Sequence, residues 1–394
     1  MKNIHFFLFA VGIVFISCHQ EDLAKNEIEI ILSEKEDGTR NIVTAMKNIE
    51  IINLQIDSNY MYNEDAQLRV SNNYYYFVSS GVFDPSRIQL MCYDNATGKL
   101  LLSRNIKGRA RNECIEVCNW YVKDDKIVIN DCGTLKMYDH TGKFYGVLGK
   151  AKSNCLLPMG DGFVNFIIGG FGNNGKGIML LDSAFNEKKS YFDVPDEYIT
   201  GSYVRLSNTS PDKYVLNDTL RFLYQYTFRL HYFPGNKTYH FITPHPIPQS
   251  LLSNSDGEFK SIINDCVING YANYVTGLAE NQNYITFKYM IGNFTIFVLL
   301  SKRDNKVFCV GDDSDVDETD LSNIVWINLL LGADIIYSDG KYFYMRAGKA
   351  LYKLFDKYKD ELDDRQRTIY EAMHRQMTAN DVNDFNCFYF KIEF

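Results

Sequence analysis

Three charged residues stand close together in one short segment: Arg109, Arg111 and Glu113. Guanidinium groups and a carboxylate can hold a polar ligand through charge-assisted hydrogen bonds. A structural alternative remains open, in which Arg109 pairs with Glu113 and latches two neighbouring units together. The segment therefore provides a candidate ligand-binding set.

Three aromatic residues form the second candidate group, Trp120, Tyr121 and Trp326. Aromatic rings that are exposed at a binding surface can stack on a sugar ring, whereas the same residues inside strands belong to the core. We expect Trp120 and Trp326 to lie on inner strands, so both alternatives stay open. We list all three residues as candidate ligand contacts.

The sequence contains no recognisable catalytic motif, and the catalytic residues stay unknown. It has neither a G-x-S-x-G nucleophile elbow nor an H-E-x-x-H metal motif. Many carboxylates could supply a glycosidase pair, but the sequence does not say which two face each other. The eight cysteines that follow Cys18 include no C-x-x-C or C-x-x-H pair, so we predict buried thiols, no metal site and no cofactor.

The N-terminus has the pattern of an export signal. Lys2 precedes a 13-residue stretch, residues 4–16, that is apolar except for one histidine and too short for a bilayer span of about 20 residues. It ends in Phe-Ile-Ser-Cys, which resembles a bacterial lipoprotein box, so we predict lipidation of Cys18. We therefore expect a signal peptide over 1–17, a polar tether over 18–45 and a membrane partner reached through the lipid anchor.

The residues after Cys18 also indicate a cellular location. They include Glu21 and Asp22, and this acidic start resembles the surface-export signal of lipoproteins in some gut anaerobes. We therefore expect an outer-membrane lipoprotein exposed at the cell surface. The net charge of −8 is spread along 394 residues without a basic tract, so we predict no nucleic-acid partner.

A repeated turn indicates the elements that must position these residues. Tyr-Asp-Asn-Ala-Thr-Gly-Lys at 93–99 returns as Tyr-Asp-His-Thr-Gly-Lys at 138–143, an offset of 45 residues between Asp94 and Asp139. Each copy lies between two apolar runs, which is typical of a β-hairpin. A hairpin that recurs every ~40–50 residues indicates the blades of a β-propeller.

Six such units can be traced along the chain, over residues 68–106, 115–148, 154–192, 203–241, 270–310 and 325–392. The sixth includes expected strands at 325–327 and 350–355. Residues 243–268 and 356–382 read as insertions, the second of them helical. We predict an all-β, six-bladed propeller over 46–394, in which the early strand Ile49–Leu54 pairs beside Phe388–Ile392 and closes the ring.

These features resemble the six-bladed β-propeller lipoproteins of gut anaerobes, a family that is also similar to NHL-type propellers. The resemblance rests on residues 49–54, on the Tyr-Asp-x-x-Thr-Gly-Lys turns and on Asn-Asp-Phe-Asn at 383–386. In that family the first interblade loop reads Gly-Arg-Gly-Pro-Gly-Glu. Here Gly108, Arg109 and Glu113 match, whereas the central Gly-Pro-Gly does not. The resemblance implies fold and location more than activity.

The function that these observations favour is binding of a glycan or a partner protein by a surface-anchored propeller. A polysaccharide lyase or glycoside hydrolase, with its site in the propeller channel, is the alternative. A third possibility is a scaffold subunit that docks through 243–268 or 356–380. Fold alone does not choose among the three.

Overall fold

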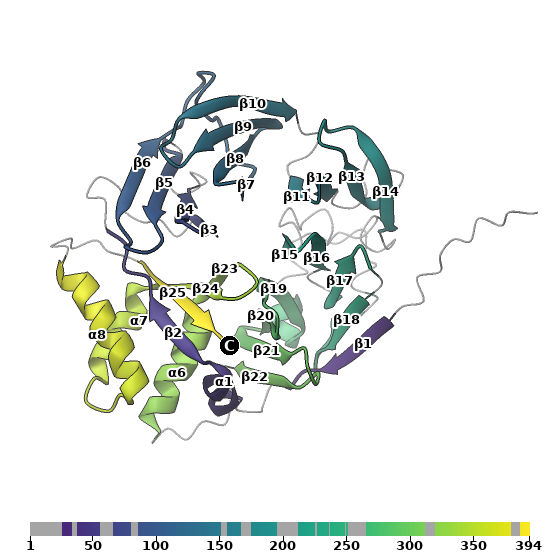
Figure 1. The fold of residues 1–394 in the computed structure, drawn as a ribbon. Coiled ribbons are helices and arrows are strands. Elements are labelled where there is room, and N and C mark those ends of the chain that lie inside the picture. The colour runs from purple at the N-terminus through teal and green to yellow at the C-terminus, as the bar shows by residue number, and fades with distance from the viewer. Residues whose placement is uncertain are drawn as a thin grey trace, which may run out of the picture.

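Six sheets, antiparallel except for one parallel pair of strands, stand around a central axis in the computed structural model, which confirms the predicted six-bladed β-propeller (Figure 1). The structure describes residues 26–33, 38–55, 66–79, 86–150, 156–166, 175–194, 212–224, 227–235, 237–248, 250, 265–311, 320–379 and 387–394.

Each of the first three blades is a four-stranded meander whose innermost strand comes first. Blade one consists of β3 (Gln67–Val70), β4 (Tyr74–Val78), β5 (Gln89–Asp94) and β6 (Leu100–Asn105). Blade two consists of β7 (Asn119–Lys123), β8 (Lys126–Asp131), β9 (Thr134–Asp139) and β10 (Phe144–Lys150). Blade three consists of β11 (Leu156–Met159), β12 (Gly162–Phe166), β13 (Lys176–Leu181) and β14 (Glu187–Asp193).

Of the remaining blades, the fourth and the sixth include a strand from the N-terminal part of the chain. Blade four consists of β15 (Asp212–Leu216), β16 (Thr219–Tyr224), β17 (Arg229–Phe233), β18 (Lys237–Ile242) and β1 (Asn26–Ile31). Blade five consists of β19 (Ala272–Glu280), β20 (Tyr284–Ile291), β21 (Phe294–Ser301) and β22 (Val307–Gly311). Blade six consists of β23 (Asp334–Ser338), β24 (Phe343–Gly348), β25 (Cys387–Glu393) and β2 (Asn48–Ile51).

The ring closes as predicted. Strand β2 runs antiparallel to β25, with Ile49 opposite Ile392, and the backbone N–H of Ile52 donates to the carbonyl oxygen of Tyr389 at 2.9 Å. Without β2, the outer edge of β25 would be unpaired and exposed, and the pairing with β2 covers it.

Two further elements lie within the range 18–45 that was expected to be a tether. Strand β1 pairs in parallel with the outer strand β18, and helix α1 (Thr39–Ala45) lies against β22 and the C-terminal helices. The sequence Asn-Glu-Ile-Glu-Ile-Ile over β1 alternates polar and apolar residues, as a half-buried strand does. The many charges around it obscured this signal, and the folded part of the chain begins well before residue 46.

Blade six carries helices where two strands were predicted, and these two predictions are wrong. Residues 325–327 lie within α6 (Leu321–Gly332), and 350–355 lie within α7 (Lys349–Lys357). The apolar run of α6 is long enough for a helix, and Asp320 caps it by accepting a hydrogen bond from the N–H of Asn323 at 3.0 Å.

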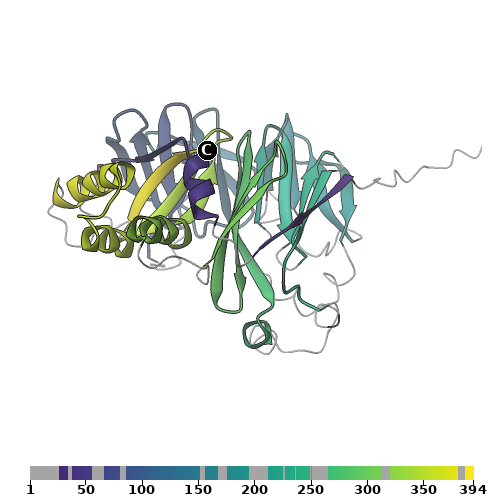
Figure 2. The same cartoon turned by 90° about the horizontal axis from the view of Figure 1, so that it is seen from below.

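The predicted C-terminal helix is present as α8 (Asp364–Ala379). Helices α6, α7 and α8 lie together on the outer side of blade six (Figures 1 and 2). The helical insertion near the C-terminus is therefore larger than expected and starts before β23. Among the described helices, none has both the length and the apolar character to cross a membrane.

The core lies between neighbouring blades. Large side chains such as Tyr76, Trp120 and Tyr138 fill the space between blades one and two, while Phe166 and Phe222 do so between blades three and four. Each fully buried side chain of this size contributes roughly 1.5–3 kcal/mol through the hydrophobic effect. Because the same packing recurs around the ring, the inner strands are held at fixed positions about the axis.

The repeated turns form as the sequence indicates. Asp94 accepts hydrogen bonds from the N–H and the hydroxyl of Thr97, at 2.8 and 2.6 Å, and Gly98 adopts φ +67°. Asp139 accepts the equivalent pair from Thr141, at 2.8 and 2.7 Å, with Gly142 at φ +75°. Only glycine takes this backbone conformation at little cost, so turn geometry explains the shared Asp, Thr and Gly of the two turns, Asp-x-x-Thr-Gly in the first and Asp-x-Thr-Gly in the second.

Several predictions fall outside the described residues. These are the signal peptide with Cys18, the start of the fourth unit at 203–211, the Asn-Asp-Phe-Asn segment at 383–386 and the central part of the insertion at 243–268.

Candidate functional site

A cavity of about 610 Å³ lies on the propeller axis. All six inner strands contribute to its wall, with Arg69 from β3, Trp120 and Tyr121 from β7, Pro158 from β11, Lys213 and Tyr214 from β15, Leu278 from β19 and Tyr337 from β23. Pockets of roughly 300–1,000 Å³ are the usual size for small-molecule sites. The axial cavity is therefore the candidate functional site.

The central polar group in this wall is the guanidinium of Arg69. Its Cζ atom lies 5.2 Å from the ring centre of Trp120 and 5.4 Å from that of Tyr337, so aromatic rings from the two neighbouring blades hold it. One of its N–H groups donates to the carbonyl oxygen of Leu68 at 2.8 Å. Two cation–π contacts at these distances fix the position of the charge in the cavity wall.

Arg69 has no acidic partner among the residues that the structure describes. Burial lowers the pKa of its guanidinium, because the charge has lost water without gaining a carboxylate. An arginine nonetheless stays charged at physiological pH. The cavity therefore contains a cation to which an anionic group could bind.

The two predicted aromatic contacts on β7 do line this cavity, but they are almost completely buried. Trp120 is 1% exposed and donates from its indole nitrogen to Gln67 at 3.0 Å, while Tyr121 is 5% exposed and packs against Phe163. Neither offers an open ring face for a sugar to stack on. Trp120 instead orients Arg69.

The far side of the cavity is formed by blade four, which stands across the axis from blade one (Figure 1). Tyr214 of blade four and Ser338 of blade six line the cavity and also bond to Glu280 at the end of β19. The hydroxyl of Ser338 donates to the Glu280 carbonyl oxygen at 2.8 Å, and that of Tyr214 lies 3.4 Å from the Glu280 carboxylate. A network around Glu280 thus supports this part of the cavity wall.

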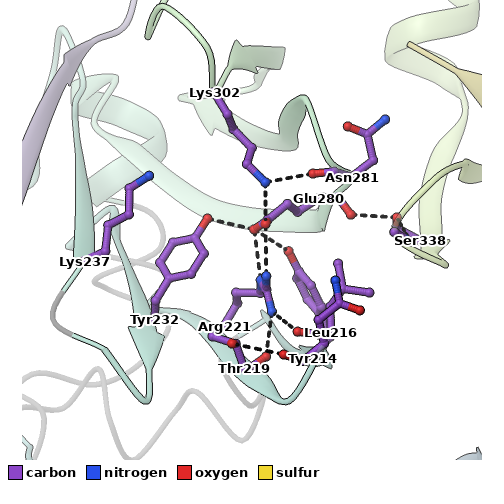
Figure 3. A network of polar contacts seen from close by, with 12 residues as sticks. Tyr214, Leu216, Thr219, Arg221, Tyr232, Lys237, Glu280, Asn281, Lys302 and Ser338 are labelled. Atoms are coloured by element: carbon purple, nitrogen blue, oxygen red, sulfur yellow. Dashed lines mark hydrogen bonds and ion pairs between the residues drawn. The ribbon is translucent and has the colours of Figure 1, made fainter.

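The carboxylate of Glu280 is 3% exposed and receives charge-assisted hydrogen bonds from two cations (Figure 3). Arg221 donates through Nε at 3.0 Å and through Nη2 at 3.1 Å, and Lys302 donates at 2.7 Å. The Tyr232 hydroxyl adds a fourth bond at 2.7 Å. These contacts join blade four to blade five, and Ser338 extends them to blade six.

Charge and burial compete in this network. Burial alone would raise the pKa of Glu280, but the hydrogen bonds and charges of Arg221 and Lys302 outweigh it and hold the pKa below its ordinary value. Burial and the nearby carboxylate raise the pKa of Tyr232, so this phenol stays protonated and donates to Glu280. Every one of these groups has a partner, and we interpret the network as a clamp between blades.

The predicted ligand-binding set of Arg109, Arg111 and Glu113 lies elsewhere. Arg109 and Arg111 are exposed in the loop between β6 and β7, at the opposite end of the blades from the turn after β3, and neither lines the axial cavity. Glu113 folds back onto its own loop and accepts a hydrogen bond from the N–H of Ala110 at 2.9 Å. The structure therefore does not bring these three residues to the site.

The loop instead packs on blade two. The Lys136 ammonium donates to the Glu113 carbonyl oxygen, and Cys114 lies 3.4 Å from the hydroxyl of Tyr138. No ion pair joins Arg109 to Glu113 among the described residues, so the latch that we considered takes a different form.

Trp326 lies outside the cavity as well. It belongs to α6, is 3% exposed, and donates from its indole nitrogen to Asp363 at 2.9 Å. The guanidinium of Arg365 lies 5.5 Å from its ring centre. Trp326 therefore packs between α6 and the start of α8 and does not reach the cavity.

Two important residues were missed by the sequence analysis, Arg69 and Glu280. Each sits in an otherwise apolar inner strand, Arg69 in Gln-Leu-Arg-Val and Glu280 at the end of a nine-residue strand. A charged residue within such a strand needs a partner or a ligand, and this was the available signal. The partners of both lie far away in sequence, which is why the pairing could not be read.

Comparison with solved structures finds this fold in other proteins. A crystal structure from Bacteroides fragilis, described as that of a candidate exported protein, is 13% identical, with 93% of this chain and 99% of that chain covered and a TM-score of 0.66. A member of the DUF4221 family from Bacteroides vulgatus is 9% identical, with 88% and 99% covered and a TM-score of 0.48. No family model and no curated protein matches the sequence. The likeness to the Bacteroides fragilis structure is one of fold: this chain is a six-bladed β-propeller similar to a candidate exported protein.

Proposed function

We propose that the protein is an exported, lipid-anchored binding protein whose axial cavity takes an anionic ligand, with an acidic glycan as the class that fits best. The observation that carries the proposal is the guanidinium of Arg69, held between Trp120 and Tyr337 in the cavity wall. Lys213 also lines this cavity, with its ammonium 5.5 Å from the ring centre of Phe166.

The geometry of Arg69 favours a carboxylate or sulfate over a neutral sugar. A guanidinium presents its N–H groups in a planar fork that matches two oxygens of one anionic group. Among the described residues, one of the Arg69 N–H groups has an acceptor, the Leu68 carbonyl oxygen. A bound anion would also compensate the charge of Arg69, which has lost its hydration on burial. A uronic acid or a sulfated sugar has such a group on a ring of suitable size.

The cavity supports binding better than hydrolysis. Among the described residues that line it, the carboxylates are Asp124 and Asp125, which are neighbours in one turn between β7 and β8. A glycosidase needs two carboxyl groups that flank the scissile bond from different sides, roughly 5–10 Å apart. Two adjacent turn residues are a poor match for that arrangement.

Binding can be tested with an array of glycans that carry uronic acids or sulfate groups, each beside its neutral parent. We expect binding of acidic members only. Arg69→Ala should weaken it roughly 10- to 100-fold, since a hydrogen bond to a charged group contributes about 1.5–3 kcal/mol. Arg69→Lys should also bind more weakly, because the fork is lost while the charge is kept.

Arg111→Ala provides the matched control, since Arg111 is exposed on a loop away from the cavity. Thermal unfolding of each variant separates loss of binding from loss of fold. Equal binding by the wild type and a folded Arg69→Ala variant would disprove the proposed site. Shortened glycan products would favour the enzyme alternative.

The lipid anchor rests on the Phe-Ile-Ser-Cys sequence before and at Cys18. Labelling of growing cells with a palmitate analogue should mark the protein, and Cys18→Ala should abolish the label. Protease added to intact cells should remove the wild-type protein if it faces outward. Labelling that survives in Cys18→Ala would rule out this anchor.

A further inference from the structure

Two thiols and one carboxylate converge at one end of blade two, outside the axial cavity. The side-chain ligand atoms of Glu116, Cys118 and Cys132 all lie within 4.8 Å of one another. The Cys132 sulfur lies 3.6 Å from Oε2 of Glu116. Glu116 and Cys132 are exposed and Cys118 is partly buried, so an ion can reach the group from solvent.

The spacing of these atoms matches the edges of a tetrahedral metal site. With zinc–sulfur distances of about 2.3 Å and zinc–oxygen distances of about 2.1 Å, two ligands at the tetrahedral angle lie about 3.6 Å apart for sulfur and oxygen and about 3.8 Å for two sulfurs. The observed distance from Cys132 to Glu116 equals the first value. All pairs of ligand atoms in the group lie within 4.8 Å, which is only about 1 Å more than the ideal separation of two zinc-bound sulfurs.

The backbone holds the three residues in place. Cys118 directly precedes β7, and its N–H donates to the carbonyl oxygen of Asn130 at 2.9 Å. The N–H of Glu116 donates to the side chain of Asp131 at 3.0 Å. Cys132 follows β8 in a left-handed conformation, with φ +48°, and begins the turn into β9. Little reorganisation is therefore needed to bring the ligands onto one ion.

The neighbouring carboxylate is already engaged. Asp131 accepts hydrogen bonds from the N–H groups of Ile115 and Glu116 and pairs with Lys136 at 2.7 Å. It positions the loop that carries Glu116 rather than competing for the ion.

We propose that Glu116, Cys118 and Cys132 bind one zinc ion, with the fourth position open to solvent. Two thiolates and a carboxylate are ligands that zinc accepts in tetrahedral geometry, and thiolates favour it over magnesium or calcium. Binding releases the two thiol protons to water and involves no redox change. The site lies on blade two and is independent of the anion site proposed on the axis.

Sequence spacing did not reveal this group. Its ligands follow an E-x-C pattern and a cysteine 14 residues later, at Cys132, and they meet because the β7–β8 hairpin brings its two ends together. The same proximity makes a disulfide between Cys118 and Cys132 the competing outcome in an oxidising compartment.

The test is titration of the purified, reduced protein with zinc in competition with a chromogenic chelator. We expect one ion per chain. Cys118→Ser and Cys132→Ser should each abolish stoichiometric binding. Glu116→Gln should weaken it at least roughly tenfold, since even residues that only orient a metal ligand have effects of that size.

Glu371→Gln, at an exposed position on α8, and Cys92→Ala, at a buried thiol in β5, are the matched controls and should bind as the wild type does. Full-strength binding by Glu116→Gln would overturn the three-ligand site.

A second readout does not depend on the folding of any variant. Cobalt added to the wild-type protein should give a thiolate-to-cobalt charge-transfer band and the visible spectrum of a tetrahedral ion, both removed by zinc. Absence of these bands would overturn the proposal. So would peptide mapping that finds Cys118 and Cys132 joined by a disulfide in protein taken from the cell envelope.

Discussion

Ile49 lies directly opposite Ile392, and this pairing joins an N-terminal strand to the C-terminal strand across the seam of blade six. The N–H of Ile52 donates to Tyr389, and hydrogen bonds along an antiparallel ladder alternate, so the N–H of Glu50 points toward Lys391. The side chain of Glu50 is exposed. The seam can therefore be weakened through the backbone without altering the core.

Glu50→Pro should destabilise the protein, because proline removes one ladder hydrogen bond and leaves an acceptor on β25 unpaired. An unsatisfied buried or half-buried group costs about 1–3 kcal/mol. Glu50→Ala keeps the N–H and should change the free energy of unfolding by less than about 0.5 kcal/mol. Denaturant unfolding of the two variants measures the difference, and equal stabilities would argue against closure through β2.

Gly98 should tolerate no side chain. A Cβ atom there would lie 1.7 Å from the carbonyl oxygen of Asn53, and its φ of +67° is already unfavourable for other residues. Gly175 has a similar φ of +76° but open space around it. We expect Gly175→Ala to cost about 1–2 kcal/mol through backbone strain and Gly98→Ala to cost clearly more. A thermal shift that is equal in the two would contradict the close contact with Asn53.

Glu280→Gln should be strongly destabilising, since it leaves the charges of Arg221 and Lys302 without their counter-charge in a buried position. Removal of one partner from a buried ion pair typically costs 3–5 kcal/mol. Glu361→Gln, at an exposed site before α8, is the control and should be nearly neutral. Unfolding in denaturant compares them, and a loss below about 1 kcal/mol would exclude a clamp role.

The contribution of Glu280 should also depend on pH. Its folded pKa lies below the ordinary value of 4.5, so its stabilising effect is fully present above that pH and is lost as the pH falls through the folded pKa. The stability difference between wild type and Glu280→Gln should therefore be constant around neutral pH and shrink below about 4.5. A stability difference between the two proteins that grows as the pH falls would contradict the lowered pKa of Glu280.

Asp320 should stabilise α6 through its cap rather than through its ion pair. Its side chain accepts from the N–H of Asn323 and also lies 3.1 Å from Arg40, whose side chain is 80% exposed. Asp320→Ala should cost about 0.5–2 kcal/mol, whereas Asp320→Asn keeps the cap and should cost little. Arg40→Ala should be close to neutral. The reverse order in unfolding experiments would give the main role to the ion pair.

Much of the ring was predictable because its signals are local. The turns at Asp94 and Asp139 depend on residues within a few positions, and the strands around them alternate clearly. The seam could be predicted because a closed ring needs a partner for β25 and Ile49–Leu54 had no blade of its own. In contrast, the helix α6 was mistaken for a strand, since an apolar run buried on all sides has no periodicity that separates the two.

The site was less predictable, since its contacts join distant parts of the chain. Arg69 meets Trp120 and Tyr337 only when blades one, two and six are adjacent, and Glu280 meets Arg221 only across blades four and five. The loop around Arg109 has the right composition for binding a polar ligand but is held on blade two, where the Lys136 ammonium donates to the Glu113 carbonyl oxygen. Residue type identified candidates, and topology decided which of them reach the axis.

The N-terminal segment follows the outside of the ring across several blades. Strand β1 pairs with blade four, the N–H of Gly38 donates to Cys309 of blade five at 2.9 Å, β2 completes blade six, and the N–H of Gln55 donates to Gly98 of blade one at 2.9 Å. Among the described residues, no such strand pairing or hydrogen bond joins the N-terminal segment to blades two and three. Local opening should therefore differ between blades. Amide hydrogens of blades two and three should exchange with deuterium faster than those of the four blades that the N-terminal segment joins.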